Sequence, residues 1–239
     1  MNIRYLLLTA FLLISEFFFI GLPPQQSEFW IAFIRIIAAL VLSLWYYQHR
    51  KPLSTNIDKL FITTLILPVL ISVGVMISPA LIKNINLIIH AFILCLWACI
   101  FKLMGAKIKF QGAFYKFIRI IPVYALFPIL FYIITLHPAL PVSQKIMLLC
   151  YTLLYIYTAT LSSFLPIKDV ERFWISWSVV LMAFANLLVF YSFFVEPLPW
   201  LGFIPRLIVI IARCILIIGM VDYFSSRQSS STQPLTSSD

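Results

Sequence analysis

Long apolar runs separated by short polar segments cover the chain from its start to about residue 224. Each run approaches the ~20 mainly apolar residues that an α-helix needs to cross a bilayer. The breaks between the runs contain proline, glycine and charged residues, which end helices. The pattern predicts eight membrane-spanning helices. They are expected at Tyr5–Leu22, Phe29–Tyr47, Leu60–Ile77, Asn86–Leu103, Phe117–Leu136, Ile146–Leu165, Phe173–Val195 and Phe203–Phe224.

Composition supports this interpretation. Of the 239 residues, 63% are hydrophobic and only 10% are charged, and the mean hydropathy is +1.05. Soluble domains carry about 25% charged residues. We therefore predict an all-α polytopic membrane protein, with residues 1–224 forming one transmembrane domain. Residues 225–239 (SSRQSSSTQPLTSSD) predict a disordered polar tail, which we expect to be cytoplasmic.

The net charge of +9 has an explanation in membrane topology. Lysine and arginine gather at the helix ends of one side, as the positive-inside rule describes, so no nucleic-acid partner is inferred. With both termini inside, only Lys83, Lys145 and Arg206 fall in outer segments, and Arg35 and Arg213 lie within spans. The asymmetry predicts eight helices with both termini cytoplasmic, and a bacterial inner membrane is the expected location.

The first apolar run is expected to stay in the mature protein. It has a basic start at Arg4, as a signal peptide would, but Glu16 interrupts its core and no small-x-small cleavage site follows. The segment Gly21–Pro24 is typical of a turn. We therefore interpret this run as the first transmembrane helix.

All four cysteines fall within apolar spans, where cysteine behaves as a small hydrophobe. They are Cys95, Cys99, Cys150 and Cys214. Cys95 and Cys99 share a helical face, but a zinc site needs three or four ligands. The spacing gives no disulfide framework, and we expect neither a metal nor a cofactor.

Two charged residues at membrane depth are expected to pair. Glu16 lies twelve residues beyond Arg4, and Arg35 lies twelve residues before Tyr47. At a rise of 1.5 Å per residue, both sit about 18 Å from the inner surface. Their spans are joined by a short turn. The pair is either a structural ion pair that neutralises two buried charges or part of a site.

A second group of polar residues lies at similar depth in the later spans. Asn186 and Arg213 occupy sequential antiparallel helices, His90 lies in the outer third of the fourth span, and Tyr151 and Tyr155 are one turn apart in the sixth. Separately these residues are explained as a satisfied core histidine and belt tyrosines. Together they predict a polar cavity that opens toward the outer leaflet, because ionisable residues within membranes mark function.

The motifs of soluble enzymes are absent: the chain has no GxSxG, HExxH or Walker loop. Three short matches nevertheless have the order and spacing of a known family. They are Lys51-Pro52-Leu53-Ser54 after the second span, Tyr151 early in the sixth, and Ala185-Asn186 in the seventh. With the eight-span layout, the chain resembles the YhhN-type lysoplasmalogenase-like membrane proteins.

The resemblance implies a hydrolase that cleaves the vinyl-ether bond of lysoplasmalogens into a fatty aldehyde and a glycerophospho-alcohol. This chemistry needs a proton donor and an activated water, which paired carboxylates would supply. The chain departs from the family at both aspartates, where it has Val75 and Asn186, and His90 is displaced from the family's register. Whether the protein is an enzyme therefore stays open.

The function predicted from the sequence is hydrolysis or binding of a single-chain phospholipid in an intramembrane cavity. Glu16 and Asn186 are the candidate catalytic residues. The candidate substrate-binding residues are Arg35, His90, Tyr151, Tyr155 and Arg213. Membrane lipids are the expected partners, and an oligomer or a membrane complex is left open. The main alternative is a non-catalytic lipid-binding or scaffolding subunit of a membrane complex. A small-solute transporter is the last alternative, because the sequence shows no internal repeat of the kind that many transporters have.

Overall fold

The computed structural model describes residues 3–19, 24–51, 53, 55–77, 82–108, 122–196 and 203–231. Every regular element within these ranges is helical, which confirms the all-α prediction for this part of the chain. The elements in chain order are α1 (Ile3–Phe19), α2 (Pro24–Arg50), α3 (Asn56–Ile66), α4 (Pro68–Ile77), α5 (Ile82–Leu103), η2 (Pro122–Leu126), α7 (Phe127–Phe131), η3 (Tyr132–Leu136), α8 (His137–Ala139), α9 (Val142–Ser163), α10 (Asp169–Phe194) and α11 (Ile204–Ser231).

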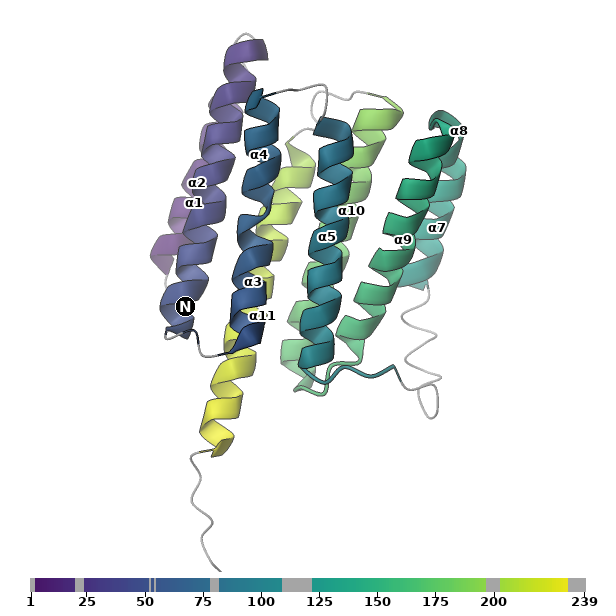
Figure 1. Ribbon diagram of the computed structural model, residues 1–239. Helices are drawn as coiled ribbons and strands as arrows, with labels where there is room; N and C mark the ends of the chain where they lie inside the picture. The colour runs from purple at the N-terminus through teal and green to yellow at the C-terminus, as the bar shows by residue number, and fades with distance from the viewer. Residues whose placement is uncertain are drawn as a thin grey trace, which may run out of the picture.

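The helices lie side by side in a bundle and run roughly along one direction (Figure 1). Large side chains fill its interior, and Phe61, Phe101, Leu148 and Phe190 are all buried. Helices α10 and α11 approach closely, because a carbon added at Gly219 would lie 2.9 Å from the Ile175 side chain. Small residues allow such backbone contact between membrane helices.

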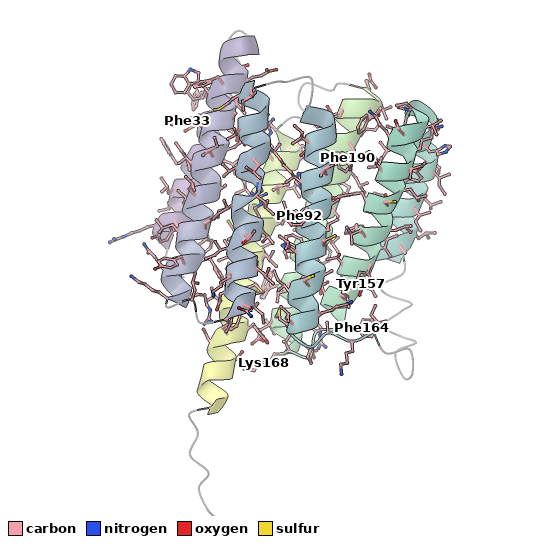
Figure 2. The ribbon with its side chains drawn as sticks, in the orientation of Figure 1. Phe33, Phe92, Tyr157, Phe164, Lys168 and Phe190 are labelled. Carbon is pink, nitrogen blue, oxygen red and sulfur yellow. The ribbon has the colours of Figure 1, made fainter. Side chains whose placement is uncertain are left out.

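The outer surface of the bundle is apolar. Phe33 on α2 and Phe92 on α5 are among its exposed aromatic side chains (Figure 2). Within the described residues, six helices are long and apolar enough to cross a membrane. They are Ser27–Arg50, Asn56–Ile77, Ile85–Leu103, Val142–Ser163, Asp169–Phe194 and Ile204–Ser226. These helices support an integral membrane protein, as composition predicted.

Two of the eight predicted spans give shorter helices in the described residues. Helix α1 has 17 residues, and the predicted fifth span corresponds to the shorter apolar helix Tyr124–Ala139. Residues 117–121 of that prediction lie outside the described ranges. The fifth segment is irregular because Pro122 opens the π-helical turn η2 and Pro128 stands at the start of α7. Proline lacks the N–H that a regular helix uses.

The C-terminal helix runs beyond the predicted start of the tail. Helix α11 continues to Ser231, whereas the sequence predicted a polar tail from residue 225. Ser226 donates a hydrogen bond to Glu171 on α10 at 2.8 Å, and Ser225 donates one to the Val221 carbonyl. The bond from Ser226 attaches this added turn of α11 to α10. Residues 232–239 lie outside the described ranges.

The span Asn56–Ile77 consists of two helices, α3 and α4, that meet at Leu67 and Pro68. Pro68 has no N–H to donate to the preceding turn. The backbone stays continuous because Leu67 donates to the Thr63 carbonyl at 2.9 Å. Proline is tolerated in a membrane helix where such neighbouring bonds remain.

A buried polar cluster, which we term the Asp58 clamp, joins α2 to α3 at the lower end of the bundle in Figure 1. It consists of Tyr46, Arg50, Thr55 and Asp58. Asp58 is fully buried and accepts hydrogen bonds from the Tyr46 hydroxyl at 2.6 Å and from Arg50 at 3.0 and 3.2 Å. Thr55 caps α3 and forms a capping box with Asp58.

The clamp also reaches the last helix. The Arg50 guanidinium lies over the Phe224 ring at 3.8 Å from its centroid, which is a cation–π contact. One arginine therefore connects α2, α3 and α11. Sequence reasoning assigned Arg50 and Asp58 to an inter-helix segment and did not foresee their pairing.

Candidate functional site

A cavity of about 200 Å³ lies among six helices. Its polar lining is Glu16 from α1, Arg35 from α2, Ser72 from α4, Asn86 and His90 from α5, Asn186 and Ser192 from α10, and Arg206 and Arg213 from α11. Apolar side chains complete the wall, among them Leu42, Ile71, Val209 and Phe193. The cavity therefore combines charged groups with a hydrocarbon surface.

The cavity-lining side chains of α11 share one face of the helix. On α11 the lining residues are Pro205, Arg206, Val209, Ile210 and Arg213. Counted from Arg206, the last three follow at a spacing of three, four and seven, which places these side chains on one helical face. Arg206 and Arg213 are two turns apart, so the charged lining extends about 10 Å along the helix axis.

Glu16 lies between two arginines. The Arg206 guanidinium donates a hydrogen bond to its carboxylate at 2.9 Å, and Arg35 Nε lies 3.6 Å from the other oxygen. The predicted pairing of Glu16 with Arg35 is therefore confirmed. The closer partner is Arg206, which the sequence had assigned to an outer segment. Its seven-residue spacing from Arg213 was the signal that would have placed it on the same face.

Arg213 has a different environment. It is 9% exposed and lines the cavity. No carboxylate among the described residues forms an ion pair with it, because the ion pairs there involve Arg35, Arg50, Arg172 and Arg206. A buried charge without a partner costs several kcal/mol in a low-dielectric interior.

Asn186 connects the cavity to the bundle core. Its side-chain amide donates a hydrogen bond to the Tyr151 hydroxyl at 2.8 Å and lies 3.5 Å from His90 Nδ1. Tyr151 is buried and packs edge-on against Phe190 at 5.1 Å. Asn186 and His90 thus line the cavity, and the buried Tyr151 fixes the Asn186 side chain through a hydrogen bond.

Most of the site residues predicted from sequence meet at this cavity. Glu16, Arg35, His90, Asn186 and Arg213 all line it. Tyr151 contacts the lining through Asn186, but Tyr155 is not among the lining residues. Four further polar lining residues were missed as candidates: Ser72 and Asn86, which are both buried, Ser192 and Arg206. Asn86 lies one helical turn before His90, a spacing that placed both on one face.

The cavity lining favours an anionic ligand. Three guanidinium groups face one carboxylate, so positive charge remains after Glu16 is balanced. Arginine binds phosphate and carboxylate groups through parallel hydrogen bonds. Within the described residues, no group of three or more His, Cys, Asp or Glu side chains is placed to hold a metal ion.

Comparison of the chain with protein-family models, curated proteins and solved structures found no match. Two residues of the Lys51–Ser54 motif, Pro52 and Ser54, lie outside the described ranges. Val75, which stands where the resemblance implied an aspartate, is buried and is not a lining residue of the cavity.

Replacing Tyr151 with phenylalanine is expected to destabilise the protein by about 1–3 kcal/mol, because the Asn186 amide would lose its buried acceptor. Thermal unfolding of the purified protein in detergent measures the change. Tyr155→Phe is the matched control: Tyr155 is equally buried, and no hydrogen bond among the described residues involves its hydroxyl. Equal effects of the two substitutions would contradict the role given to Tyr151.

Proposed function

We propose that the protein binds a single-chain phospholipid in the cavity among α1, α2, α4, α5, α10 and α11. The observation that carries this proposal is Arg213, a buried cation that lines the cavity and has no acidic partner among the described residues. An anionic group on the ligand would neutralise it, and a bidentate contact would fix the orientation of that group.

A lipid suits the cavity better than a fully water-soluble anion. The protein is built of apolar membrane helices, and Leu42, Val209 and Ile210 line the cavity beside the arginines. An amphiphile satisfies both surfaces, because its headgroup contacts the cations and its chain contacts the apolar wall. The cavity of about 200 Å³ is smaller than the ~300–1,000 Å³ pockets that enclose drug-sized ligands. It can therefore enclose a headgroup and only the first carbons of one chain, and the rest of the chain would lie outside it.

Binding is proposed as the main function, and lysoplasmalogenase-type hydrolysis as its enzymatic form. In that form Glu16 is the candidate acid, and Asn186 orients the headgroup. The contacts of Glu16 argue against catalysis, since its carboxylate accepts a hydrogen bond from Arg206 and pairs with Arg35. Both oxygens of the carboxylate face guanidinium groups, so neither oxygen is free to approach a vinyl carbon. The replacement of the family's aspartates by Val75 and Asn186 points in the same direction.

The proposed topology has eight spans with both termini cytoplasmic, in a bacterial inner membrane. Helix α1 and the segment Tyr124–Ala139 would complete the six longer helices. Under this arrangement Lys51, Lys102 and Lys168 lie on the cytoplasmic side, in agreement with the positive-inside rule.

Lipid extraction from the purified protein tests the proposal. Mass spectrometry of the extract is expected to find a single-chain phospholipid in near-stoichiometric amount in the wild type and a loss of at least about tenfold in Arg213→Gln. Arg172→Gln is the control, because Arg172 bonds with Asp169 and the Leu165 carbonyl, away from the cavity. A protein that carries no such lipid, or the same amount in both variants, would refute the binding function.

Incubation with lysoplasmalogen separates the two forms of the proposal. Release of fatty aldehyde that disappears in Glu16→Gln supports hydrolysis, and binding without aldehyde supports the non-catalytic form. A protein that purifies with a partner chain and without lipid supports the scaffolding alternative instead.

A further inference from the structure

The side chains that face the cavity carry more positive than negative charge, and this imbalance restricts the charge of the ligand's headgroup. Among the described residues, the lining holds Arg35, Arg206 and Arg213 but only one acid, Glu16. Both oxygens of the Glu16 carboxylate are already in contact with arginines, at 2.9 and 3.6 Å. No acidic side chain in the lining is therefore left for a positive group on a ligand.

The scarcity of aromatic residues in the lining also argues against a positively charged group on the ligand. A quaternary or primary ammonium that lacks an acidic partner is usually bound by a cage of aromatic faces. Here Phe193 is the one aromatic residue among the lining residues, and a single ring does not make a cage. A zwitterionic headgroup would place its ammonium among arginines and pay a repulsive cost.

The neutral polar residues supply the remaining contacts. Asn86 is buried and makes no hydrogen bond with other described residues, and it lines the cavity together with Ser72 and Ser192. Hydroxyl and amide groups of this kind bond to a glycerol hydroxyl or to ester oxygens. The set matches a phosphate joined to a short polyol.

We propose that the headgroup bound here is a phosphate monoester with no cationic substituent, as in a 1-acyl-glycerol 3-phosphate. The inference rests on the proposed binding function and narrows its ligand. Arg213 holds the phosphate, and Arg35 and Arg206, which contact Glu16, add positive charge to the same cavity. Asn86 and the serines contact the glycerol, and the acyl chain extends along Val209 and Ile210 toward the lipid. A dianionic phosphate balances the excess positive charge better than a monoanionic carboxylate does.

Binding of a headgroup series with one acyl chain tests the inference. The purified full-length protein in nanodiscs of neutral lipid is titrated with 1-oleoyl-glycerol 3-phosphate, with oleoyl lysophosphatidylethanolamine and with oleate. We expect the phosphate monoester to bind at least about tenfold more tightly than either of the others, which is the effect of one charged hydrogen-bonded contact. Equal affinities for the three lipids overturn the headgroup inference and leave the binding function intact.

Water-soluble anions distinguish the contribution of the headgroup to binding from that of the acyl chain. Inorganic phosphate and glycerol 3-phosphate are expected to bind far more weakly than the lipid, because they lack the chain. If they bind as tightly, the preference for phosphate stands but the lipid ligand, and with it the proposed function, fails. If none of the compounds binds, both proposals fail.

Two variants locate the preference in the cavity. Arg213→Gln is expected to remove the tenfold preference, and Arg213→Lys to retain part of it, since lysine keeps the charge but not the fork of donors. Arg172→Gln, which changes an arginine away from the cavity, is expected to retain the whole preference. A preference that survives in Arg213→Gln refutes the assigned contact, and the wild-type series decides the headgroup even where a variant does not fold.

Discussion

Replacing Glu16 with alanine is expected to destabilise the protein by about 3–5 kcal/mol, the usual cost of removing one partner from a buried ion pair. Glu16 is the acid that balances the arginines of the cavity, and its side chain is 3% exposed. Without it, three guanidinium groups would share one low-dielectric space. Thermal unfolding in detergent, followed through tryptophan fluorescence, measures the loss.

Three further variants make this test specific. Glu28→Ala removes an exposed acid from the start of α2 and should change stability by no more than about 0.5 kcal/mol. Replacing Glu16, Arg35 and Arg206 together with methionine removes the pair and both partners, and should destabilise less than Glu16→Ala alone. If Glu16→Ala unfolds at the wild-type temperature, the carboxylate does not balance the cavity.

The second large loss of stability is expected at the Asp58 clamp. Asp58→Ala should also destabilise the protein by about 3–5 kcal/mol, because Arg50 would remain buried without its partner. Asp58 accepts hydrogen bonds from Tyr46, Arg50 and Thr55, so the loss of one residue leaves several donors unpaired. The same unfolding measurement applies.

Matched substitutions separate the contributions within the Asp58 clamp. Tyr46→Phe removes a single hydrogen bond and should cost about 1 kcal/mol. Asp169→Ala breaks the pair with Arg172 at a carboxylate that is 94% exposed, and exposed pairs contribute about 0–1 kcal/mol. A loss for Asp58→Ala as small as that for Asp169→Ala would show that the clamp does not hold the helices together.

Some residues of the cavity could be predicted from the sequence because a charged side chain in lipid has a high free-energy cost. Glu16, Arg35 and Arg213 are charges within apolar runs, and such charges turn toward the protein interior because lipid cannot satisfy them. Depth, counted from helix ends, then gave the pairing of Glu16 with Arg35, which the structure contains. The rise of a helix is constant, so this step needed no tertiary information.

Arg206 and Asn86 were missed for a common reason. Both stand near the beginning of a helix, where a polar residue is ordinarily explained by contact with water or headgroups. Whether such a residue turns inward depends on rotation of its helix about the axis, and packing against neighbouring helices sets that rotation. The Asp58 clamp escaped prediction for the same reason, since its partners come from two helices and a connecting segment.

The length of the spans was predicted less well than their location. Hydropathy found the apolar segment around Pro128, but Pro122 and Pro128 alter the hydrogen-bond register there, so the helix is shorter and irregular. Polarity likewise placed the end of the last helix too early, because hydropathy does not register the hydrogen bond by which Ser226 attaches the added turn to Glu171 on α10.

Pro68 gives the span formed by α3 and α4 a hinge. Asp58 fixes the half formed by α3, and the half formed by α4 contributes Ile71 and Ser72 to the cavity wall. Bending is easiest where a backbone hydrogen bond is missing. A change in tilt of α4 about Pro68 would therefore alter the width of the cavity while the Asp58 clamp keeps its bonds.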